Sequence, residues 1–269
     1  MSKISFGFLG GGQMATAIAK GAVVSKLAAP NEIGFFDTSE KQSTLLREKF
    51  PGCSVFASAE DLFRSCQRII LAVKPQTLAA VAAGLSSFVS RDHLIVSIAA
   101  GVPTAKLIGW FGTDRMIRVM PNTPCQSLQG ASGIAAAKSA TSDDCLWCES
   151  LFSAVGKVVR VSEEQLHAVT GLSGSGPAYV LMMIEALSDG GVMAGLSREA
   201  AMELATQTVL GAAAMVQETG IHPAILREQV TSPAGTTIAA LSTMERAGFR
   251  SAVIDGVMAA VNRSKELAG

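Results

Sequence analysis

A glycine-rich turn close to the start of the chain constrains its fold more than any other feature. The sequence GFLGGGQMATAIAKG places Gly10, Gly12 and Ala15 in a G-x-G-x-x-A pattern between a short apolar run and a helical pattern. Gly10 permits a tight turn, Gly12 lets the backbone approach a pyrophosphate, and Ala15 keeps the helix near the sheet. Free amides at the helix N-terminus then face the phosphates. In this context the turn predicts a dinucleotide site, with a ligand-free glycine turn as the alternative.

Short apolar runs alternate with helical patterns through the first 160 or so residues. The expected strands are residues 4–9, 33–36, 54–56, 68–73, 94–99, 116–120 and 158–161. Helical patterns at residues 13–25, 40–50 and 59–65 separate the earlier ones. Strands separated by helices favour βαβ units and a parallel sheet covered on both faces. We therefore predict an α/β fold in which residues 1–162 form a Rossmann domain with a doubly wound, mostly parallel sheet.

The sequence changes character after residue 161. Residues 178–188 and 198–218 are helical patterns that are apolar over more than half of their circumference. Such helices must be buried on most sides. Hydrophobic residues make up 49% of the chain and charged residues only 16%. We predict that residues 163–269 form an all-helical domain that binds substrate and dimerises, with helices of a second subunit completing its burial. A compact monomeric helical domain is the alternative.

Charge and hydropathy exclude several classes of partner. The 22 basic and 22 acidic residues cancel, and no Lys/Arg tract is present, so neither nucleic acid nor an anionic membrane surface is expected. No apolar stretch reaches the roughly 20 residues that a membrane span needs. The N-terminal residues lack the pattern of a signal peptide. We expect a cytoplasmic protein with a small-molecule substrate.

Cysteine and histidine usage gives no sign of a metal or disulfide site. The five cysteines are an odd number, and Cys145 and Cys148 form a C-x-x-C inside a helical pattern. That context lacks the strand and turn of a redox motif, and neither a second pair nor a histidine cluster completes a zinc site. His93, His167 and His222 are scattered along the chain. We expect no metal.

The residues after the second expected strand bear on the choice of cofactor. Asp37 is the acidic residue that would bind the ribose 2′-hydroxyl of NAD, whereas Thr38, Ser39 and Lys41 would suit the 2′-phosphate of NADP. The signal is mixed, and these residues leave the choice open.

Three further loops follow expected strands: AVKPQ at residues 72–76, AAGVP at 99–103 and MPNTP at 120–124. Open α/β sheets bind ligands at the carboxyl ends of their strands. Each loop alone could be ordinary turn chemistry, stiffened by Pro75, Pro121 and Pro124. Three such loops beside a glycine turn favour a nicotinamide pocket.

Two polar, glycine-rich motifs interrupt the helical half. They are LSGSGPAY at residues 172–179 and TSPAGTTIAAL at 231–241, each just ahead of a helix. Helix capping by serine and threonine explains part of each motif. A helix N-terminus surrounded by hydroxyls is also a carboxylate site. We therefore expect substrate binding here.

Together, GFLGGGQMA, AVKPQ, SIAAGV, MPNTP, TGLSGSGPAY, HPAILREQVTSPAGTTI and ERAGFR resemble the pyrroline-5-carboxylate reductase family. The resemblance runs in order from about residue 4 to the C-terminus. It implies reduction of 1-pyrroline-5-carboxylate to L-proline, the last step of proline biosynthesis, usually with NADPH and with NADH possible. It also implies a Rossmann domain, an interlocking helical domain, and homo-oligomers that are dimers or pentamers of dimers.

The resemblance also implies site residues. The dinucleotide site would comprise Leu9, Gly10, Gly11, Gly12, Gln13, Met14, Thr38, Ser39, Ala72, Val73, Lys74, Pro75, Ala99, Ala100, Gly101 and Asn122, the last near the nicotinamide. The substrate site would comprise Glu163, Ser232, Gly235, Thr236 and Thr237. Thr237 is the expected catalytic residue, because its hydroxyl would hydrogen-bond the ring nitrogen. Ala234 stands where the family more often has glycine.

Three alternatives stay open. One is that Lys74 is a catalytic acid; against it, a lysine at a strand end before a proline can simply approach cofactor or solvent. A β-hydroxyacid dehydrogenase shares the Rossmann-plus-helices plan, but the SPAGTT cluster and the lack of an obvious catalytic lysine motif count against it. A non-catalytic NADP-binding or redox-sensing protein would not need a second-domain site. A Ser/His/Asp or Cys/His hydrolase set is not apparent.

Overall fold

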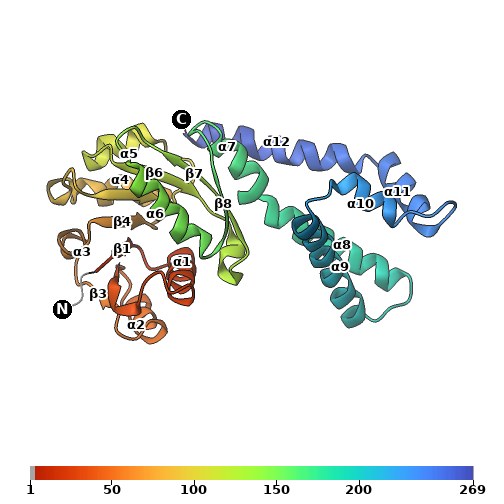
Figure 1. The fold of residues 1–269 in the computed structure, drawn as a ribbon, viewed down its shortest axis with the longest axis horizontal. Coiled ribbons are helices and arrows are strands. Elements are labelled where there is room, and N and C mark those ends of the chain that lie inside the picture. The colour runs from red at the N-terminus through yellow and green to blue at the C-terminus, as the bar shows by residue number, and fades with distance from the viewer. Residues whose placement is uncertain (1–3, 269) are drawn as a thin grey trace. The chain divides into compact units, whose positions relative to one another are not determined.

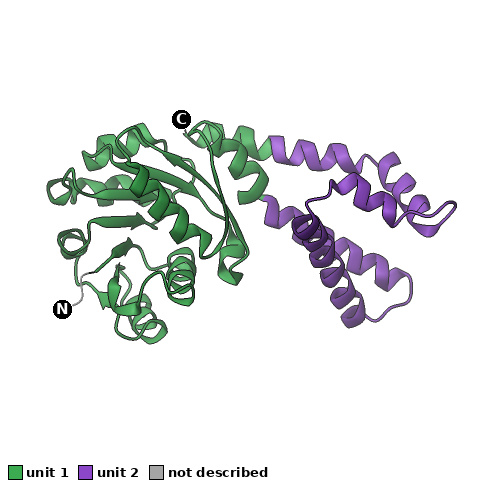
Figure 2. Ribbon diagram, in the orientation of Figure 1, with its two compact units in different colours: residues 1–175, 259–269 green, residues 176–258 purple. Residues whose placement is uncertain are grey.

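A computed structural model describes residues 4–268 of the chain. The chain forms two compact units (Figure 2). Unit 1 comprises residues 1–175 and 259–269, and unit 2 comprises residues 176–258. Both the segment that follows the last strand and the end of the chain therefore pack with unit 1, whereas the boundary expected from the sequence lies at residue 162.

Unit 1 is built on one eight-stranded sheet (Figure 1). Its strands are β1 (Phe6–Leu9), β2 (Ile33–Phe36), β3 (Ser54–Val55), β4 (Arg68–Leu71), β5 (Leu94–Ser97), β6 (Met116–Met120), β7 (Gly130–Ala136) and β8 (Gly156–Arg160). The strand order is β3-β2-β1-β4-β5-β6-β7-β8. All neighbouring strands are parallel except β6 and β7. The predicted doubly wound, mostly parallel sheet is confirmed.

The helices of unit 1 connect these strands. They are α1 (Gln13–Val24), η1 (Pro30–Glu32), α2 (Glu40–Lys49), α3 (Ala59–Ser65), α4 (Pro75–Ala83), η2 (Ser86–Phe88), α5 (Thr104–Phe111), η3 (Thr123–Ser127), α6 (Ser142–Ser153), α7 (Leu166–Val169), the π-helical turn η4 (Thr170–Gly174), and the end of α12 (Phe249–Ala268). The order of the sheet reverses between β1 and β4, which places a ligand crevice at the carboxyl ends of these strands.

Two hydrophobic clusters form the core of unit 1. Ile70 and Val96 belong to one cluster, whereas their neighbours Leu71 and Ile95 belong to the other. Because successive strand residues point to opposite faces, the clusters cover opposite faces of the sheet. Helices α1, α2 and α6 contribute to the first cluster, and α3, α4 and α5 to the second. The glycine turn thus follows a strand of a sheet that has an apolar core on both faces.

The antiparallel strand β7 has no counterpart among the expected strands. Its sequence, GASGIAA, is rich in small residues and lacks a long apolar run. The structure shows why: a Cβ at Gly133 would lie 2.7 Å from a methyl carbon of Val169, and one at Gly130 would overlap Cys125. Close packing selects glycine here, and glycine removes the pattern by which a strand is predicted.

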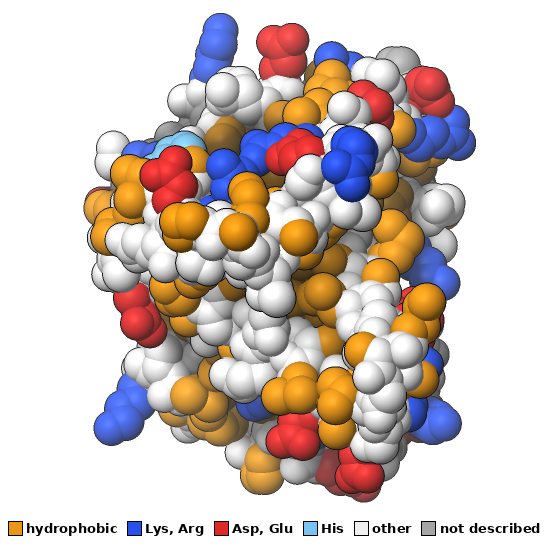
Figure 3. All heavy atoms as spheres, turned by 90° about the vertical axis from the view of Figure 1, so that its right-hand side faces the viewer, with side chains coloured by type: hydrophobic (Ala, Val, Ile, Leu, Met, Phe, Trp, Pro, Cys, Tyr) orange, Lys and Arg blue, Asp and Glu red, His pale blue; other side chains and the backbone are white. Residues whose placement is uncertain are grey.

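Unit 2 consists of helices with very little interior. It contains α8 (Gly176–Met193), α9 (Arg198–Thr219), α10 (Pro223–Gln229), α11 (Thr236–Arg246) and the first half of α12. All its residues are described, and only Ser188, Ala201, Ala205 and Leu226 are buried. Its exposed large apolar side chains include Leu181, Met182, Met193, Leu204, Leu210 and Ile254. Figure 3 turns the right-hand side of Figure 1 toward the viewer and shows hydrophobic side chains gathered in patches between charged ones. Within residues 4–268, no helix is both long and apolar enough to span a membrane.

Candidate functional site

The glycine turn has the geometry that a bound pyrophosphate requires. Gly10 has φ +99°, and a Cβ there would lie 2.8 Å from the carbonyl oxygen of Ala72, so only glycine fits without strain. A Cβ at Gly12 would meet no described atom of the chain within 4 Å. Packing within the chain therefore does not demand glycine at this position. Together with the unpaired amides of the first turn of α1, this open backbone fits the phosphates of a dinucleotide.

The Asp37 carboxylate accepts a hydrogen bond from the backbone of the glycine turn. Its Oδ2 accepts a hydrogen bond from the Gly11 amide at 2.8 Å, and its Oδ1 accepts one from the Ser39 amide at 2.9 Å. Gln42 adds a hydrogen bond from Nε2 to the Gly11 carbonyl oxygen at 2.5 Å. Both oxygens of Asp37 are thus engaged by backbone. Thr38, Ser39 and Lys41 are exposed beside them.

A pocket of about 290 Å³ lies at the carboxyl ends of β4, β5 and β6. It is lined by Met14, Ala72, Val73, Lys74, Pro75, Ile98, Ala99, Ala100, Met120 and Pro121. Seven of these residues are among the expected dinucleotide residues. Lys74 precedes α4 as its N-cap and is exposed. The AVKPQ, AAGVP and MPNTP loops therefore meet in one mostly apolar pocket of the kind that a nicotinamide ring occupies.

Asn122 connects the MPNTP loop to two other segments. Its Nδ2 donates to the carbonyl oxygen of Ser173 at 2.9 Å, and its Oδ1 accepts from the Ala131 amide at 2.8 Å. The side chain is 8% exposed. Asn122 thus fixes the loop after β6 against β7 and against the π-helical turn, which gives it a structural function beside the expected contact with nicotinamide.

Glu163 lies on the segment between β8 and α7, in unit 1. Its Oε1 accepts hydrogen bonds from the Thr104 amide at 2.6 Å and from Arg118 Nη1 at 2.9 Å. Burial disfavours its charged form, but the amide and hydroxyl of Thr104 and the guanidinium of Arg118 outweigh burial and lower the pKa of the carboxyl. The other expected substrate residues belong to unit 2.

In unit 2, the TSPAGTT motif forms a tight turn that leads into α11. The Gly235 amide donates to the carbonyl oxygen of Ser232 at 3.1 Å, and a Cβ at Gly235 would overlap Ser232. Ala234 has φ +56°, in the left-handed region that favours glycine. Gly235 is the N-cap and has no side chain to cap the helix. The turn thus brings together Ser232, Gly235, Thr236 and Thr237, with the unpaired first amides of α11.

The LSGSGPAY motif spans the π-helical turn and the start of α8. The Ser173 hydroxyl donates to the Val169 carbonyl oxygen at 3.1 Å, and the Ser175 amide donates to that of Thr170 at 2.8 Å. The Ser173 hydroxyl therefore hydrogen-bonds backbone of the same segment. Isolated π-turns inside helices often mark functional positions.

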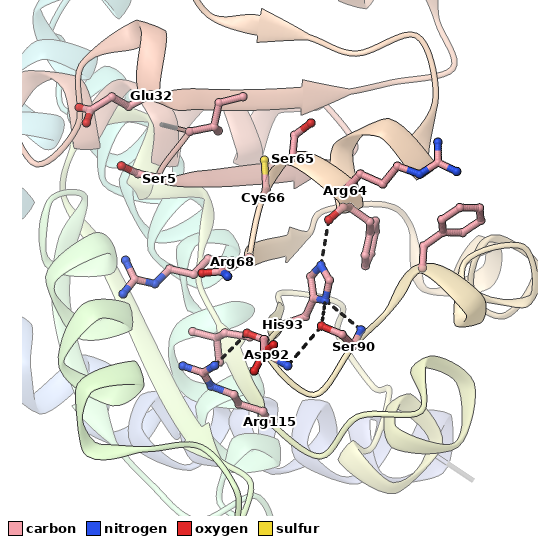
Figure 4. A pocket seen from close by; sticks show the side chains of 15 residues that line it. Ser5, Glu32, Arg64, Ser65, Cys66, Arg68, Ser90, Asp92, His93 and Arg115 are labelled. Atoms are coloured by element: carbon pink, nitrogen blue, oxygen red, sulfur yellow. Dashed lines mark hydrogen bonds between the residues drawn. The ribbon is translucent and has the colours of Figure 1, made fainter. Parts of the chain in front are cut away.

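A larger pocket of about 670 Å³ lies at the opposite, amino-terminal edge of the sheet (Figure 4). Several of its polar side chains have partners within the chain. His93 Nδ1 accepts from the Ser90 amide, and its Nε2 lies 2.9 Å from the Phe63 carbonyl oxygen. Arg115 pairs with the buried Asp144, and Arg68 lies over the ring of Trp147. Size alone therefore does not make this pocket the reactive site.

Within residues 4–268, no group of three or more histidine, cysteine or acidic side chains is arranged to hold a metal ion. All five cysteines are free, and burial raises the pKa of the Cys148 thiol. The C-x-x-C pair lies on α6, as the helical pattern predicted.

Comparison with known proteins connects these sites to a family. The family model described as pyrroline-5-carboxylate reductase dimerisation matches residues 163–267, and that described as NADP oxidoreductase coenzyme F420-dependent matches residues 5–101. A pyrroline-5-carboxylate reductase of Arabidopsis thaliana is 46% identical over 97% of this chain and 94% of its own. One of Methanosarcina acetivorans is 44% identical over 99% of both chains. The chain belongs to the pyrroline-5-carboxylate reductase family.

Solved structures agree with this assignment. A pyrroline-5-carboxylate reductase of Coxiella burnetii has 36% identity and a TM-score of 0.94, with all of both chains covered. The Plasmodium falciparum pyrroline carboxylate reductase, solved with NADP bound, has 31% identity and a TM-score of 0.88 over the full length of both chains. The predicted arrangement of a Rossmann domain followed by a helical domain is therefore that of pyrroline-5-carboxylate reductases.

Sequence reasoning missed several residues that shape the site. Ile98, Met120 and Pro121 line the apolar pocket but were not among the expected residues, although all three lie in motifs that were noticed, SIAAGV and MPNTP. Arg118 and Thr104 were also missed. Arg118 offered a signal, because a charged residue inside the apolar strand MIRVM needs a partner when it is buried.

Proposed function

We propose that this chain reduces 1-pyrroline-5-carboxylate to L-proline with NADPH as the hydride donor. The observation that carries the proposal is the combination, in one member of this family, of an open glycine turn beside an apolar pocket and a separate helix N-terminus rich in hydroxyls. The first suits a dinucleotide and the second a small carboxylate. One hydride adds to the imine carbon and one proton to the nitrogen.

Unit 1 would hold the cofactor. The free amides at the start of α1 would bind the pyrophosphate, which the open backbone at Gly12 lets approach, and the pocket lined by Ala72, Ala99 and Met120 would enclose the nicotinamide. When bound, the dihydronicotinamide supplies the hydride. The apolar lining of the pocket would exclude water from this ring.

Unit 2 would hold the substrate. The unpaired amides of Thr236 and Thr237 and the hydroxyl of Ser232 would bind the substrate carboxylate, which is also favoured by the dipole of α11. The Thr237 hydroxyl would hydrogen-bond the ring nitrogen and stabilise it as the charged imine becomes an amine. Glu163 was expected near the substrate as well, but its described contacts are with Thr104 and Arg118 in unit 1.

The surroundings of Asp37 favour NADPH over NADH. Its two oxygens already accept the Gly11 and Ser39 amides, which leaves the carboxylate fewer acceptor positions for a ribose hydroxyl. Thr38, Ser39 and Lys41 are exposed at the same strand end. The hydroxyls can donate hydrogen bonds to a 2′-phosphate, and the positive charge of the lysine is opposite to that of the phosphate.

The lack of an interior in unit 2 supports self-association. Four buried residues cannot stabilise five helical segments, and the exposed apolar side chains need a cover. We propose a homodimer in which a second copy covers these helices, with assembly of dimers into a decamer and a location in the cytoplasm as further proposals.

One assay tests the reaction and the cofactor together. Purified protein is mixed with 1-pyrroline-5-carboxylate and either NADPH or NADH, and loss of dihydronicotinamide absorbance and formation of proline are measured. We expect stoichiometric proline formation and a higher kcat/KM with NADPH. If neither cofactor is consumed, the proposed reaction is wrong. If NADH is preferred, only the interpretation of Asp37 is wrong.

A further inference from the structure

Helix α5 lacks a cap of its own. Its N-cap residue is Pro103, which has no side-chain acceptor, so the first amides of the helix need partners from elsewhere. The amide of Thr104, the first residue of the helix, donates instead to Glu163 Oε1 at 2.6 Å. The acceptor lies 59 residues further along the chain. A carboxylate at this position also interacts favourably with the helix dipole.

The same carboxylate oxygen neutralises a buried charge. Arg118 lies in the middle of β6, and its side chain is 8% exposed. Its Nη1 donates to Glu163 Oε1 at 2.9 Å. One acidic side chain therefore joins the N-terminus of α5 to the central sheet. Loss of its charge would leave the guanidinium without an anionic partner, which is costly at a buried site.

The helix that Glu163 caps, α5, directly follows a loop that lines the proposed cofactor pocket. The AAGVP loop connects β5 to α5, and Ala99 and Ala100 in this loop line the pocket of about 290 Å³. The neighbouring Gly101 has φ +73°, a conformation that only glycine adopts readily. The end of the loop nearest α5 is held by the hydrogen bond from Thr104 to Glu163.

We propose that Glu163 is a positioning residue for the cofactor: it caps α5 from a distance and thereby holds the AAGVP loop in the shape that receives the nicotinamide. This replaces its expected contact with substrate and rests on the proposed function. Removal of its charge would weaken cofactor binding, whereas the substrate affinity set by Ser232, Thr236 and Thr237 would change little.

A pair of adjacent variants tests the proposal in the full-length protein. Glu163→Gln removes the charge, and Glu164→Gln is the matched control because Glu164 is the neighbouring exposed acidic residue and its charge acts on His167 rather than on Thr104 or Arg118. Dissociation constants for NADPH are measured by fluorescence titration, and KM for pyrroline-5-carboxylate at saturating NADPH. We expect Glu163→Gln to raise the Kd for NADPH about five- to tenfold, with the substrate KM within about twofold of wild type. Glu164→Gln should match wild type.

A second pair isolates the amide hydrogen bond, even if Glu163→Gln folds poorly. Thr104→Pro deletes the amide at the first helical position, where proline is well tolerated, and Pro103 already has the extended ψ of 150° that a following proline requires. Thr104→Val removes only the hydroxyl. Thr104→Pro should weaken NADPH binding as Glu163→Gln does, Thr104→Val much less, and the double variant Glu163→Gln/Thr104→Pro no more than about twofold beyond either single variant.

The outcomes are distinguishable. An unchanged Kd for NADPH in both Glu163→Gln and Thr104→Pro overturns the positioning function. A raised substrate KM with unchanged NADPH affinity restores Glu163 as a substrate residue. Failure of the wild-type protein to bind NADPH or to form proline would overturn the proposed function itself, independently of either variant.

Discussion

The two units of this chain differ in how they are stabilised. Unit 1 buries two apolar clusters on the two faces of its sheet, with Phe8, Ile69 and Ile95 almost fully enclosed. Unit 2 buries four residues and exposes apolar side chains along each of its long helices. Since stability derives mainly from apolar burial, unit 1 has a core of the kind that stabilises a domain, whereas we expect unit 2 to depend on contacts from outside itself.

This difference also separates two tasks. A rigid sheet holds loops at fixed positions, which suits the recognition of a cofactor that many enzymes share. The turn from Ser232 to Gly235 belongs instead to the unit whose own packing is incomplete. Completion of the proposed substrate site would therefore be linked to self-association, whereas the proposed cofactor site would not depend on it.

The largest expected effect is the loss of self-association when charges are placed on the exposed apolar helices of unit 2. Leu181→Asp combined with Leu210→Asp places charges on side chains that are 65% and 60% exposed in the single chain. If a second copy covers them, this should cost several kcal/mol and reduce the particle mass measured by light scattering to that of a monomer.

The matched control lies in unit 1. Val24→Asp combined with Leu146→Asp changes side chains that are 60% and 55% exposed and should leave the particle mass unchanged. Equal effects of the two double variants would show that exposure in the single chain does not distinguish the units.

A smaller effect separates reaction from cofactor binding. Thr237→Ala removes the hydroxyl expected at the ring nitrogen and should lower kcat about a hundredfold, with the Kd for NADPH within about twofold of wild type. Thr243→Ala on the same helix is the control, because the Thr243 hydroxyl donates to the Ala239 carbonyl oxygen. Unchanged turnover in Thr237→Ala would remove this residue from the mechanism.

The converse variant lies in unit 1. Gly12→Ala adds a methyl group where the chain has open space, so the melting temperature should stay within about 2 °C of wild type. The methyl group would occupy the approach to the pyrophosphate, and the Kd for NADPH should rise at least about tenfold. Gly10→Ala should instead lower the melting temperature, because of its positive φ and the contact with Ala72. Unaltered NADPH affinity in Gly12→Ala would contradict the position of the phosphates.

The smallest effect concerns the turn ahead of α11. Alanine in the left-handed conformation costs about 1–2 kcal/mol, and the greater freedom of an unfolded glycine offsets part of any gain. Ala234→Gly should therefore stabilise the protein by less than about 1 kcal/mol, measured by denaturant unfolding. Lys26→Gly, at φ +60° in unit 1, should give a similar gain. Destabilisation by Ala234→Gly would mean that alanine has a packing function at this turn.

Local patterns predicted most of the elements. The expected helix at residues 198–218 is observed as Arg198–Thr219, and the expected strand at 68–73 as Arg68–Leu71. The residue pattern that predicts each of these elements lies within the element itself, so it can be recognised without knowledge of the tertiary contacts. β7 was missed because its glycines are selected by contacts with Cys125 and Val169, which lie outside the strand.

The sequence by itself determined the glycine turn, the alternation of strands and helices, and the motifs that place the chain in its family. Only the tertiary structure decided which groups Asp37, Asn122 and Glu163 hydrogen-bond. From the sequence, each was expected to contact a ligand or to decide which cofactor binds, and in the structure each is hydrogen-bonded to the backbone. Their partners Gly11, Ser173 and Thr104 lie 26, 51 and 59 residues away along the chain. A polar residue reads the same in the sequence whether its side chain binds a ligand or the backbone of a loop. The sequence shows which side chain is present, and the packing of the sheet decides which amide that side chain hydrogen-bonds.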